Sequence, residues 1–455
     1  MYEKDNRRRD TTKRLIETGA QRGPELAYLV AVEAGDQDNM WSTEDSVQEL
    51  GTLARTAGAK VVGTMIQRLP HPDGVTYVGK GRAQELSDLK KQLGLDLVIF
   101  DDELTPTQQR SLEKLLDARI VDRTALILDI FAQHARTREG RLQVELAQLE
   151  YRLPRLTGRG DLSRQVGGSR SASGGGVSGG GAGGAIGVRG PGETRLEIDR
   201  RRIRSRISSL KEDIEEVREQ RQIHRQQRAA QAIPVVAVVG YTNAGKSTLF
   251  NALTEASVLA EDKLFATLDP VTRHVVLPNN QEALLTDTVG FIQKLSTKLI
   301  AAFRATLEEV IDADLLLEVV DASHENAIEQ SETVNEVLEE LEATDKPRVT
   351  ALNKIDLLDD PDELDTTLYP NAVPVSALKK EGLDALLEKI SAVLASSMEP
   401  VQVMIPFARG ELVELFHRRG SVDSEQHEPE GTYITGRIPQ SLRGYYIPYA
   451  RMLHR

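Results

Sequence analysis

The chain has 455 residues, 28% of them charged and 40% hydrophobic, which are ordinary values for a globular protein of two to four domains. The formal net charge of −13 argues against a nucleic-acid-binding surface over the whole molecule, and no apolar run reaches the roughly 18 residues of a membrane span. The absence of cysteine excludes disulfides and thiolate chemistry, and together with an N-terminus that lacks a secretory leader it favours a cytoplasmic location.

Residues 1–25 are expected to form a flexible tail. Residues 26–122 alternate strand-like with helix-like runs, which predicts an N-terminal α/β domain with a mostly parallel sheet. The expected strands are 26–32, 60–67, 76–78, 97–100 and 119–121, and the expected helices are 43–57, 82–93 and 105–116. Gly79-Lys80-Gly81 could hold an anion, but a tight turn between strand and helix is the simpler interpretation.

Residues 123–232 carry a different, helical pattern. An apolar stripe of Leu142, Leu146, Leu149 and Leu153 predicts one long helix that ends at Pro154. A second helix, from about 193 to 228, carries a matching stripe formed by Leu196, Ile203, Ile207, Leu210, Ile214 and Val217. Because each stripe needs an apolar partner, we expect the two helices to pack as an antiparallel hairpin.

The loop between these helices, residues 157–192, is rich in glycine and arginine. Its charged side chains are Arg159, Asp161, Arg164, Arg170 and Arg189, so only one of them is acidic. A flexible linker is the plain alternative, but a linker joins independent bodies, whereas this loop joins two helices that need each other. The positive surface is expected to continue along the helices through Arg155, Arg195, Arg200, Arg201, Arg202, Arg204 and Arg206. We therefore predict that the tip contacts an RNA backbone.

A nucleotide-binding motif begins the region 233–398, which is the predicted GTP-binding domain. The apolar run 235–239 predicts a buried strand, and the residues after it match G-x-x-x-x-G-K-S: Gly240, Tyr241, Thr242, Asn243, Ala244, Gly245, Lys246 and Ser247. Backbone N–H groups of such a loop wrap a phosphate chain, its lysine neutralises phosphate oxygens and its serine ligates Mg²⁺. A lone match could be a glycine turn before a helix, so further motifs are needed.

Three further motifs follow, each at the end of a predicted strand. Asp287-Thr288-Val289-Gly290 would bring an aspartate to the Mg²⁺ water shell and a glycine N–H to the γ-phosphate. Asn353-Lys354-Ile355-Asp356 offers a carboxylate that can accept from both N1–H and N2–H₂ of guanine, and Ser376-Ala377-Leu378 offers backbone to the guanine O6. Because open α/β sheets bind ligands at this edge, the four motifs together predict a GTP site.

The segment Phe265-Ala266-Thr267-Leu268-Asp269 lies where a mobile switch should close on the γ-phosphate. Thr267 is the expected second Mg²⁺ ligand beside Ser247, although an ordinary loop threonine is the alternative. We predict that Lys246, Thr267 and Gly290 are the catalytic group. Phe291 follows Gly290, and since phenylalanine cannot orient a water molecule, hydrolysis should be slow alone and stimulated by a partner.

The remaining GTP-binding domain should contain strands at 283–285, 315–320, 348–352 and 372–375 and helices at 247–253, 299–311, 327–341 and 383–394. Residues 399–455 are expected to form a small α+β domain with strands at 401–405 and 432–438 and a helix at 410–418. The predicted fold class is therefore α/β, in which a P-loop GTPase domain accompanies an N-terminal α/β domain with a long helical hairpin and a small C-terminal domain.

These motifs resemble the HflX family of bacterial GTPases, together with 77–81, 101–106, 143–149 and 189–194. The resemblance implies a monomeric, cytoplasmic, ribosome-associated GTPase that binds the 50S subunit and splits or recycles stalled or idle 70S ribosomes, its tip reaching 23S rRNA. It also implies that Ser247 and Thr267 hold Mg²⁺ and that Asn353 and Asp356 hold guanine. Asn243 resembles the loop asparagine of potassium-activated GTPases, so K⁺ is a hypothetical activator. The long glycine insertion between Gln165 and Ile186 departs from the family pattern.

Three functions are compatible with these features. The first is a ribosome-splitting translation factor, and the second is a GTP-dependent ribosome-assembly or RNA-remodelling factor that uses the same arginine-rich arm on precursor RNA. The third is a nucleotide sensor that binds partners without useful hydrolysis.

Overall fold

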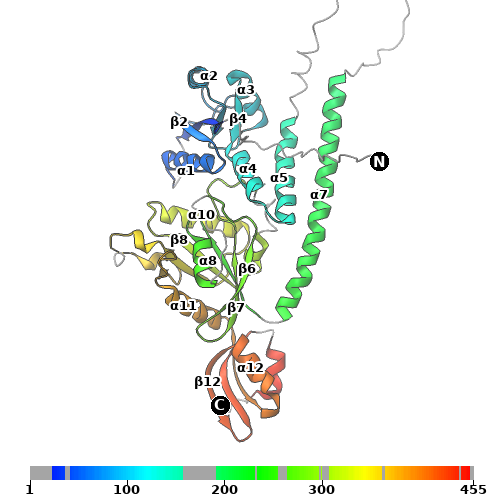
Figure 1. Ribbon diagram of the computed structural model, residues 1–455, viewed down its shortest axis with the longest axis vertical. Coiled ribbons are helices and arrows are strands. Elements are labelled where there is room, and N and C mark those ends of the chain that lie inside the picture. Colours follow the sequence, from blue (N-terminus) through cyan, green and yellow to red (C-terminus); the bar gives the residue numbers. More distant parts are fainter. Residues whose placement is uncertain are drawn as a thin grey trace, which may run out of the picture.

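A computed structural model describes residues 23–35, 41–156, 191–230, 233–254, 264–296, 299, 307–360, 364–439 and 442–450. These residues form three sheets, stacked along an elongated molecule with two long helices on one side (Figure 1). Within these ranges no helix has the length and apolar character that crossing a membrane requires.

The N-terminal sheet is parallel and has the order β2-β1-β3-β4. Its strands are β1 (Leu26–Ala34), β2 (Lys60–Leu69), β3 (Leu97–Phe100) and β4 (Arg119–Asp122), and its helices are α1 (Thr43–Thr56), α2 (Lys80–Leu93) and α3 (Pro106–Leu116). The predicted strand 76–78 is wrong. Asp73 Oδ1 accepts hydrogen bonds from the N–H groups of Val75 and Thr76, at 2.8 Å each, and so closes a turn in which Tyr77 has a φ of 63°.

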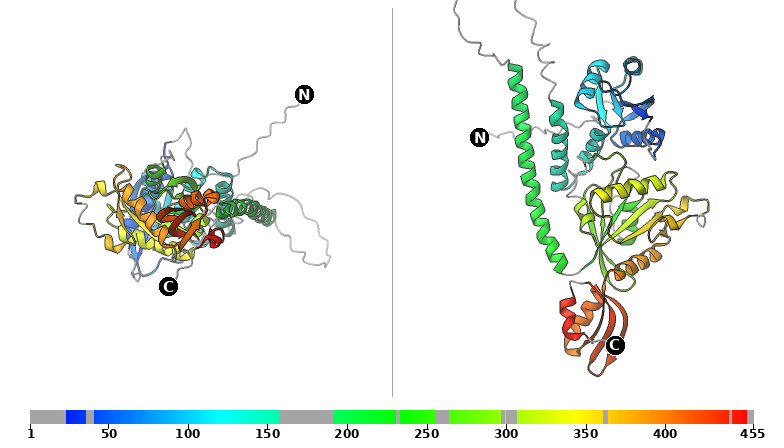
Figure 2. Two further views of the ribbon diagram at one scale, coloured as in Figure 1. Left: turned by 90° about the horizontal axis from the view of Figure 1, so that it is seen from below. Right: turned by 180° about the vertical axis from the view of Figure 1, so that it is seen from behind.

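Three helices follow the sheet: α4 (Arg123–His134), α5 (Arg138–Arg155) and α7 (Pro191–Ala230). Helices α5 and α7 run antiparallel and side by side, as the hairpin prediction requires (Figures 1 and 2). Leu210 is fully buried, and its stripe neighbours Ile203, Ile207, Ile214 and Val217 are partly buried. Apolar spacing alone thus identified the packed face of α7. The predicted tip, with Arg159, Arg164, Arg170 and Arg189, lies outside the described residues.

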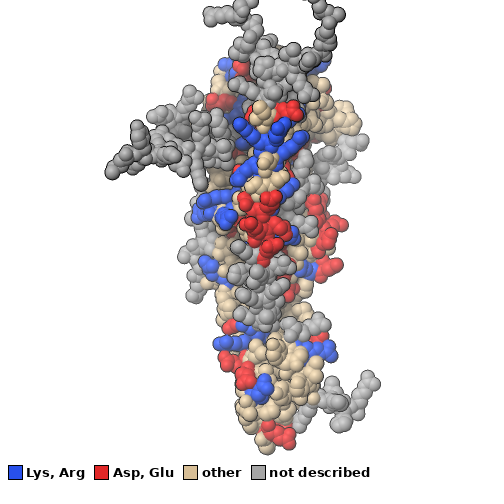
Figure 3. Space-filling view, turned by 90° about the vertical axis from the view of Figure 1, so that its right-hand side faces the viewer, with Lys and Arg blue, Asp and Glu red and all other residues tan. Residues whose placement is uncertain are grey.

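Charge on α7 is divided along its length. Basic side chains gather toward the end nearest the tip, and acidic ones gather farther along the helix (Figure 3). One predicted member of the positive surface is wrong, because the Arg155 side chain is only 10% exposed and pairs with a buried carboxylate. It lies 3.5 Å over the ring of Tyr151 and 3.2 Å from Asp122 Oδ2. Burial raises the pKa of Asp122 and Arg155 opposes that shift, so the guanidinium serves as an internal counter-ion.

The sheet of the predicted GTP-binding domain has six strands in the order β10-β9-β8-β5-β7-β6. They are β5 (Val235–Gly240), β6 (Val271–Val276), β7 (Glu282–Asp287), β8 (Leu315–Asp321), β9 (Arg348–Asn353) and β10 (Val373–Pro374). All pairs are parallel except β6 with β7, and β6 was not predicted. Its helices include α8 (Lys246–Thr254), α10 (Ala327–Glu340) and α11 (Leu383–Ser396). Of the predicted helix 299–311, residues 299 and 307–311 are described, and they are helical.

The C-terminal domain is an antiparallel sheet of order β11-β13-β12 with helix α12 (Gly410–Arg419) against it. The strands are β11 (Glu399–Ile405), β12 (Ser421–Glu428) and β13 (Gly431–Ile438), and a short helix α13 (Arg443–Tyr446) follows. The sequence pattern did not predict β12, whose mostly polar residues form an exposed edge. Arg419 Nη1 lies 2.6 Å from Glu282 Oε2, which ties this domain to β7.

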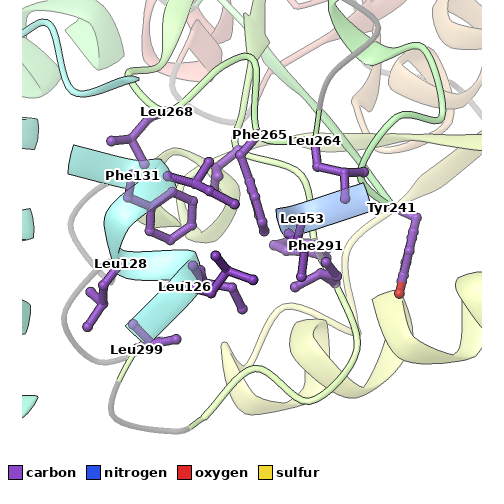
Figure 4. Packing of buried hydrophobic residues seen from close by; sticks show 14 of the residues in the cluster. Leu53, Leu126, Leu128, Phe131, Tyr241, Leu264, Phe265, Leu268, Phe291 and Leu299 are labelled. Atoms are coloured by element: carbon purple, nitrogen blue, oxygen red, sulfur yellow. The ribbon is translucent and has the colours of Figure 1, made fainter. Parts of the chain in front are cut away.

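The N-terminal domain and the predicted GTP-binding domain share one hydrophobic core. Phe131 of α4 faces Phe265 of the predicted switch, with ring centroids 4.7 Å apart, and Leu268 and Phe291 join the same cluster (Figure 4). A buried ion group lies in the same domain interface: Arg123 pairs with Asp101 at 2.8 Å and with Glu49. The two domains therefore meet through both apolar and charged contacts.

Replacing Arg123 with alanine should destabilise the N-terminal domain by about 3–5 kcal/mol, because two carboxylates would lose a buried partner. Urea denaturation followed by the fluorescence of Trp41, the one tryptophan of the sequence, would measure the shift. The matched control is Arg82→Ala on α2, whose 2.6 Å pair with Glu85 is exposed, and a change within about 0.5 kcal/mol is expected there. Equal stability of the two variants would contradict the prediction.

Candidate nucleotide-binding site

The loop between β5 and α8 has the backbone of a phosphate-binding loop. Gly240 and Gly245 have φ values of 143° and 95°, and Asn243 has a φ of 63°. A Cβ on Gly240 would overlap Val319 O, and one on Gly245 would overlap Asn353 Nδ2, so both glycines are required by space as well as by conformation. Such a turn directs successive N–H groups toward one point, which suits an anion. Whether Asn243 also holds K⁺ stays a prediction.

A cavity opens above this loop and contains most of the residues predicted to meet the phosphates and Mg²⁺. It is lined by Thr242, Asn243, Gly245, Lys246, Ser247, Thr248, Phe265, Ala266, Thr267, Thr288 and Gly290. The structure thus brings together the phosphate loop, the switch segment and the residues after β7, although they are separated in sequence.

Three oxygen-bearing side chains converge at one side of this cavity. Ser247 Oγ lies 2.7 Å from Asp287 Oδ2 and 2.8 Å from Thr267 Oγ1, and Thr267 Oγ1 lies 3.2 Å from Asp287 Oδ2. Asp287 is fully buried, and its Oδ1 has no hydrogen-bond partner among the described residues. Hydroxyl and carboxylate oxygens in this arrangement fit Mg²⁺, whose preferred ligands are oxygen atoms. The roles of Ser247 and Thr267 as its direct ligands stay predictions.

Lys246 is 7% exposed, and its Nζ donates to the carbonyl oxygen of Tyr241 at 2.6 Å. Burial lowers the pKa of Lys246 to about 8, and the nearby Asp287 carboxylate opposes that shift. Burial likewise raises the pKa of Asp287. A phosphate chain would supply the negative charge that favours the ammonium form of Lys246.

The predicted guanine residues lie together at the rim of the sheet. Asn353 Nδ2 donates to Ala244 O at 2.9 Å, and Asn353 Oδ1 accepts from Ala377 N at 3.0 Å. Ser376 Oγ donates to Asp356 Oδ1 at 2.6 Å, which orients that carboxylate. Asn353 therefore binds the phosphate loop and the Ser376–Leu378 loop to each other. Lys354 lies 2.7 Å from Asp321, Ile355 begins a short 3₁₀ turn (Ile355–Leu357), and the Leu378 side chain is 77% exposed.

The end of the switch segment turns away from the cavity and toward the N-terminal domain. Asp269 Oδ2 accepts from the N–H groups of Arg136 and Thr137, at 2.8 Å each, and Asp269 Oδ1 accepts from Thr137 Oγ1 at 2.5 Å. Thr137 is the N-cap of α5. Asp269 thus contacts the start of α5 and Leu268 lies in the apolar cluster shared with the N-terminal domain, although both were predicted to meet the nucleotide. No pattern in the sequence pointed to this contact.

Two other residues beside the site also reach the N-terminal domain. The Tyr241 hydroxyl donates to Glu49 Oε1 at 2.5 Å, and its ring stacks on Trp41 with centroids 5.8 Å apart. Lys294, four residues after Gly290, lies 2.6 Å from Asp101 and 2.7 Å from Asp102. Tyr241 can therefore offer the nucleotide its backbone only. Val289 is buried and lines a separate apolar cavity with Phe131 and Phe265.

Changing Asp356 to asparagine should lower the affinity for GDP by about a hundredfold or more, because the amide cannot accept from both N1–H and N2–H₂ of guanine. The same change should favour xanthine nucleotides, since the amide N–H₂ can donate to the oxygen that xanthine carries at C2. Calorimetry with GDP and XDP would measure both effects. Asp359→Asn, a charge-matched change at a nearby exposed position, should leave both affinities unchanged. Retention of GDP affinity by the Asp356 variant would remove that residue from the site.

Family models match the chain in four consecutive regions. They are described as GTP-binding GTPase N-terminal over residues 44–132, GTP-binding GTPase middle region over 134–228, 50S ribosome-binding GTPase over 235–354, and HflX C-terminal domain over 365–438. Among solved structures, a GTP-binding protein from Sulfolobus solfataricus in complex with GDP is 25% identical, with a TM-score of 0.41, and covers 82% of this chain and 99% of its own.

Curated relatives match over nearly the full length. The GTPase HflX of Caldanaerobacter subterraneus subsp. tengcongensis is 46% identical over 94% of this chain and 95% of its own. The GTPase HflX of Escherichia coli is 42% identical over 88% of this chain and 92% of its own. This chain therefore belongs to the HflX family of GTPases and is a GTP-hydrolysing enzyme.

Proposed function

We propose that this GTPase binds the 50S subunit in the cytoplasm and uses GTP to split or recycle stalled or idle 70S ribosomes, acting as a monomer. The match to a model described as 50S ribosome-binding GTPase supports the choice of partner. The observation that carries the proposal is the contact between Asp269 and the start of α5. It joins the nucleotide switch directly to the helical arm, the hairpin formed by α5 and α7. The arginine-rich tip of this arm is proposed to contact 23S rRNA.

The coupling follows from the spacing of two residues in the switch. Thr267 contacts Ser247 in the oxygen cluster that is proposed to hold Mg²⁺, and Asp269, two positions later, binds the N-cap of α5. Helix α5 then leads toward the loop 157–190 and, through it, to α7. A switch that is held by the γ-phosphate and released after hydrolysis would change the support of α5. The arm would thus be firmly seated in one nucleotide state and looser in the other.

GTP hydrolysis depends mainly on positioning the attacking water and on compensating negative charge on the phosphate oxygens. Mg²⁺, held by Ser247 and Thr267, would compensate charge on the phosphate oxygens when bound. Lys246 contributes a second positive charge, and the N–H of Gly290 would donate to the γ-phosphate. Phe291 is 1% exposed and offers no polar group to a water molecule. Hydrolysis should therefore be slow until the ribosome orders the site.

Sedimentation of purified 70S ribosomes with the full chain tests the function. We expect GTP to convert the 70S peak into 30S and 50S peaks, with GDP inactive, and hydrolysis to rise in the presence of 50S subunits. A non-hydrolysable analogue should support a single round, because release of the protein needs hydrolysis. Intact 70S particles with GTP, together with binding to precursor particles, would favour the ribosome-assembly or RNA-remodelling alternative. Alanine at Arg159, Arg164, Arg170 and Arg189 should abolish splitting and leave GDP affinity unchanged.

The switch-to-arm contact can be broken from the arm side by Gly140→Ala. A Cβ on Gly140 would overlap Asp269 Oδ1, while alanine itself favours the helix by about 0.5–1 kcal/mol. We expect GDP affinity to be unchanged and the ribosome-stimulated rate to fall by about fivefold or more. The matched control is Gly81→Ala in α2, where a Cβ meets nothing within 4 Å. Normal stimulation of the Gly140 variant would contradict the proposed coupling.

A further inference from the structure

The segment after β7 offers no polar side chain at the position that follows Gly290. Phe291 occupies the position after Gly290, and its N–H donates to Gly240 O at 3.1 Å while its carbonyl oxygen accepts from Thr242 N at 2.7 Å. Its side chain lies in the apolar cluster with Leu53 and Phe265 (Figure 4). These backbone bonds fix Phe291 against the phosphate loop, and because Phe291 is 1% exposed within an apolar cluster, a polar side chain there would lack hydrogen-bond partners. Another residue must orient the attacking water.

Thr242 lines the phosphate cavity and carries a hydroxyl without an evident structural task. Its side chain is 5% exposed, and its Oγ1 has no hydrogen-bond partner among the described residues. Among the described residues that line the cavity, Thr242 is the one whose buried hydroxyl lacks a hydrogen-bond partner. By contrast, the buried Thr288 hydroxyl donates to Val238 O at 2.6 Å. A buried hydroxyl without a partner is costly, so its presence calls for a partner that binds in the cavity.

The position of Thr242 identifies the end of the cavity that it serves. A Cβ built on Gly290 would lie 2.7 Å from Lys246 Nζ, 2.9 Å from Thr242 Cα and 3.0 Å from Thr242 Cγ2. Thr242, the Lys246 ammonium and the Gly290 backbone therefore meet within a few ångströms of one another. In P-loop GTPases the lysine and the switch glycine both serve the γ-phosphate. Thr242 thus lies at the γ-phosphate end rather than at the ribose end.

We propose that Thr242 is a further catalytic residue for GTP hydrolysis. Its Oγ1 donates a hydrogen bond to a γ-phosphoryl oxygen and accepts one from the attacking water. The water oxygen forms a bond to the γ-phosphorus, the bond from that phosphorus to the β–γ bridging oxygen breaks, and the proton of the water passes to the phosphate. Thr242 is unchanged by the reaction. This inference rests on the GTPase activity and not on the proposed ribosome splitting.

A purely structural role makes a different prediction. If Thr242 served only through its methyl group against Gly290, an isosteric hydrocarbon would replace it without loss. Valine keeps the branched shape and the methyl group and removes the hydroxyl, whereas serine keeps the hydroxyl and removes the methyl group. The two substitutions therefore separate the hydroxyl from the packing.

The experiment compares Thr242→Val and Thr242→Ser in the full chain, with single-turnover hydrolysis and binding of fluorescent GDP in the presence and absence of aluminium fluoride. For the valine variant we expect kcat to fall by about tenfold or more, with GDP affinity within about threefold of the unchanged protein. We also expect it to lose the gain in affinity that aluminium fluoride gives to bound GDP. The serine variant should keep kcat within about threefold and retain the aluminium fluoride complex.

Two outcomes would overturn the proposal. One is a valine variant with an unchanged kcat and an intact aluminium fluoride complex, and the other is a serine variant as slow as the valine variant. Thr242→Ala, which removes the hydroxyl without adding bulk, should reproduce the valine result and replaces it if the valine variant does not fold. Because these measurements need no ribosomes, failure here would leave the proposed ribosome splitting intact.

Discussion

The contact between Asp269 and the residues that lead into α5, Arg136 and the N-cap Thr137, is the point on which the coupling between nucleotide and arm depends. The first turn of a helix exposes N–H groups that lack partners within the helix, and a carboxylate there is favoured by both hydrogen bonding and the helix dipole. The Thr137 side chain caps α5, and Asp269 of the switch in turn accepts hydrogen bonds from the N–H and the hydroxyl of Thr137. Such a cap contributes about 0.5–2 kcal/mol, which a bound γ-phosphate can outweigh. The contact is therefore weak enough to be switched.

The apolar part of the same interface contributes a larger stabilising free energy than the Asp269 contact. Burial of a side chain such as Phe265 or Leu268 contributes about 1.5–3 kcal/mol each. Both are 2% exposed in the cluster shared with the N-terminal domain. Moving the whole switch would cost several times more than releasing Asp269 alone. The N-terminal domain thus holds one conformation of the switch, and the nucleotide must supply binding energy to change it.

The carboxyl ends of the strands in the N-terminal sheet face the GTPase domain. In open parallel sheets, ligands bind outside the carboxyl ends of the strands. Here Asp101 follows β3, and its carboxylate binds Arg123 from α4 and Lys294 from the GTPase domain. A buried ion pair often contributes little net stability compared with well-packed apolar residues, so we assign this pair a role in orientation. Lys294 therefore lies at this edge of the N-terminal sheet. Its ion pair with Asp101 holds the segment after Gly290 against that sheet.

Sequence reasoning succeeded where the determining contacts are local. The positions of the phosphate loop, Asp287, Asn353 and the apolar stripe of α7 in the fold were predictable, because strand ends and helical spacing place them without knowledge of distant partners. It failed at Arg155, whose exposure depended on the buried Asp122, and at residues 76–78, where an Asp73 side chain closes a turn. It could not place Asp269 either, since its partner Thr137 is 132 residues away. Contacts between domains leave no periodic signal in either segment.

The charge on α7 gives a physical reason why the arm should engage RNA by its tip. Arg201, Arg202 and Arg204 are exposed near the tip end, and Glu212, Glu215 and Glu216 are exposed farther along. From Arg202 to Glu212 the helix rises about 15 Å, which exceeds the Debye length of roughly 8 Å at physiological salt. An RNA backbone would therefore experience the two regions separately, attracted by the first and repelled by the second. In a chain of net charge −13, such a division confines attraction to one end and orients the arm before contact.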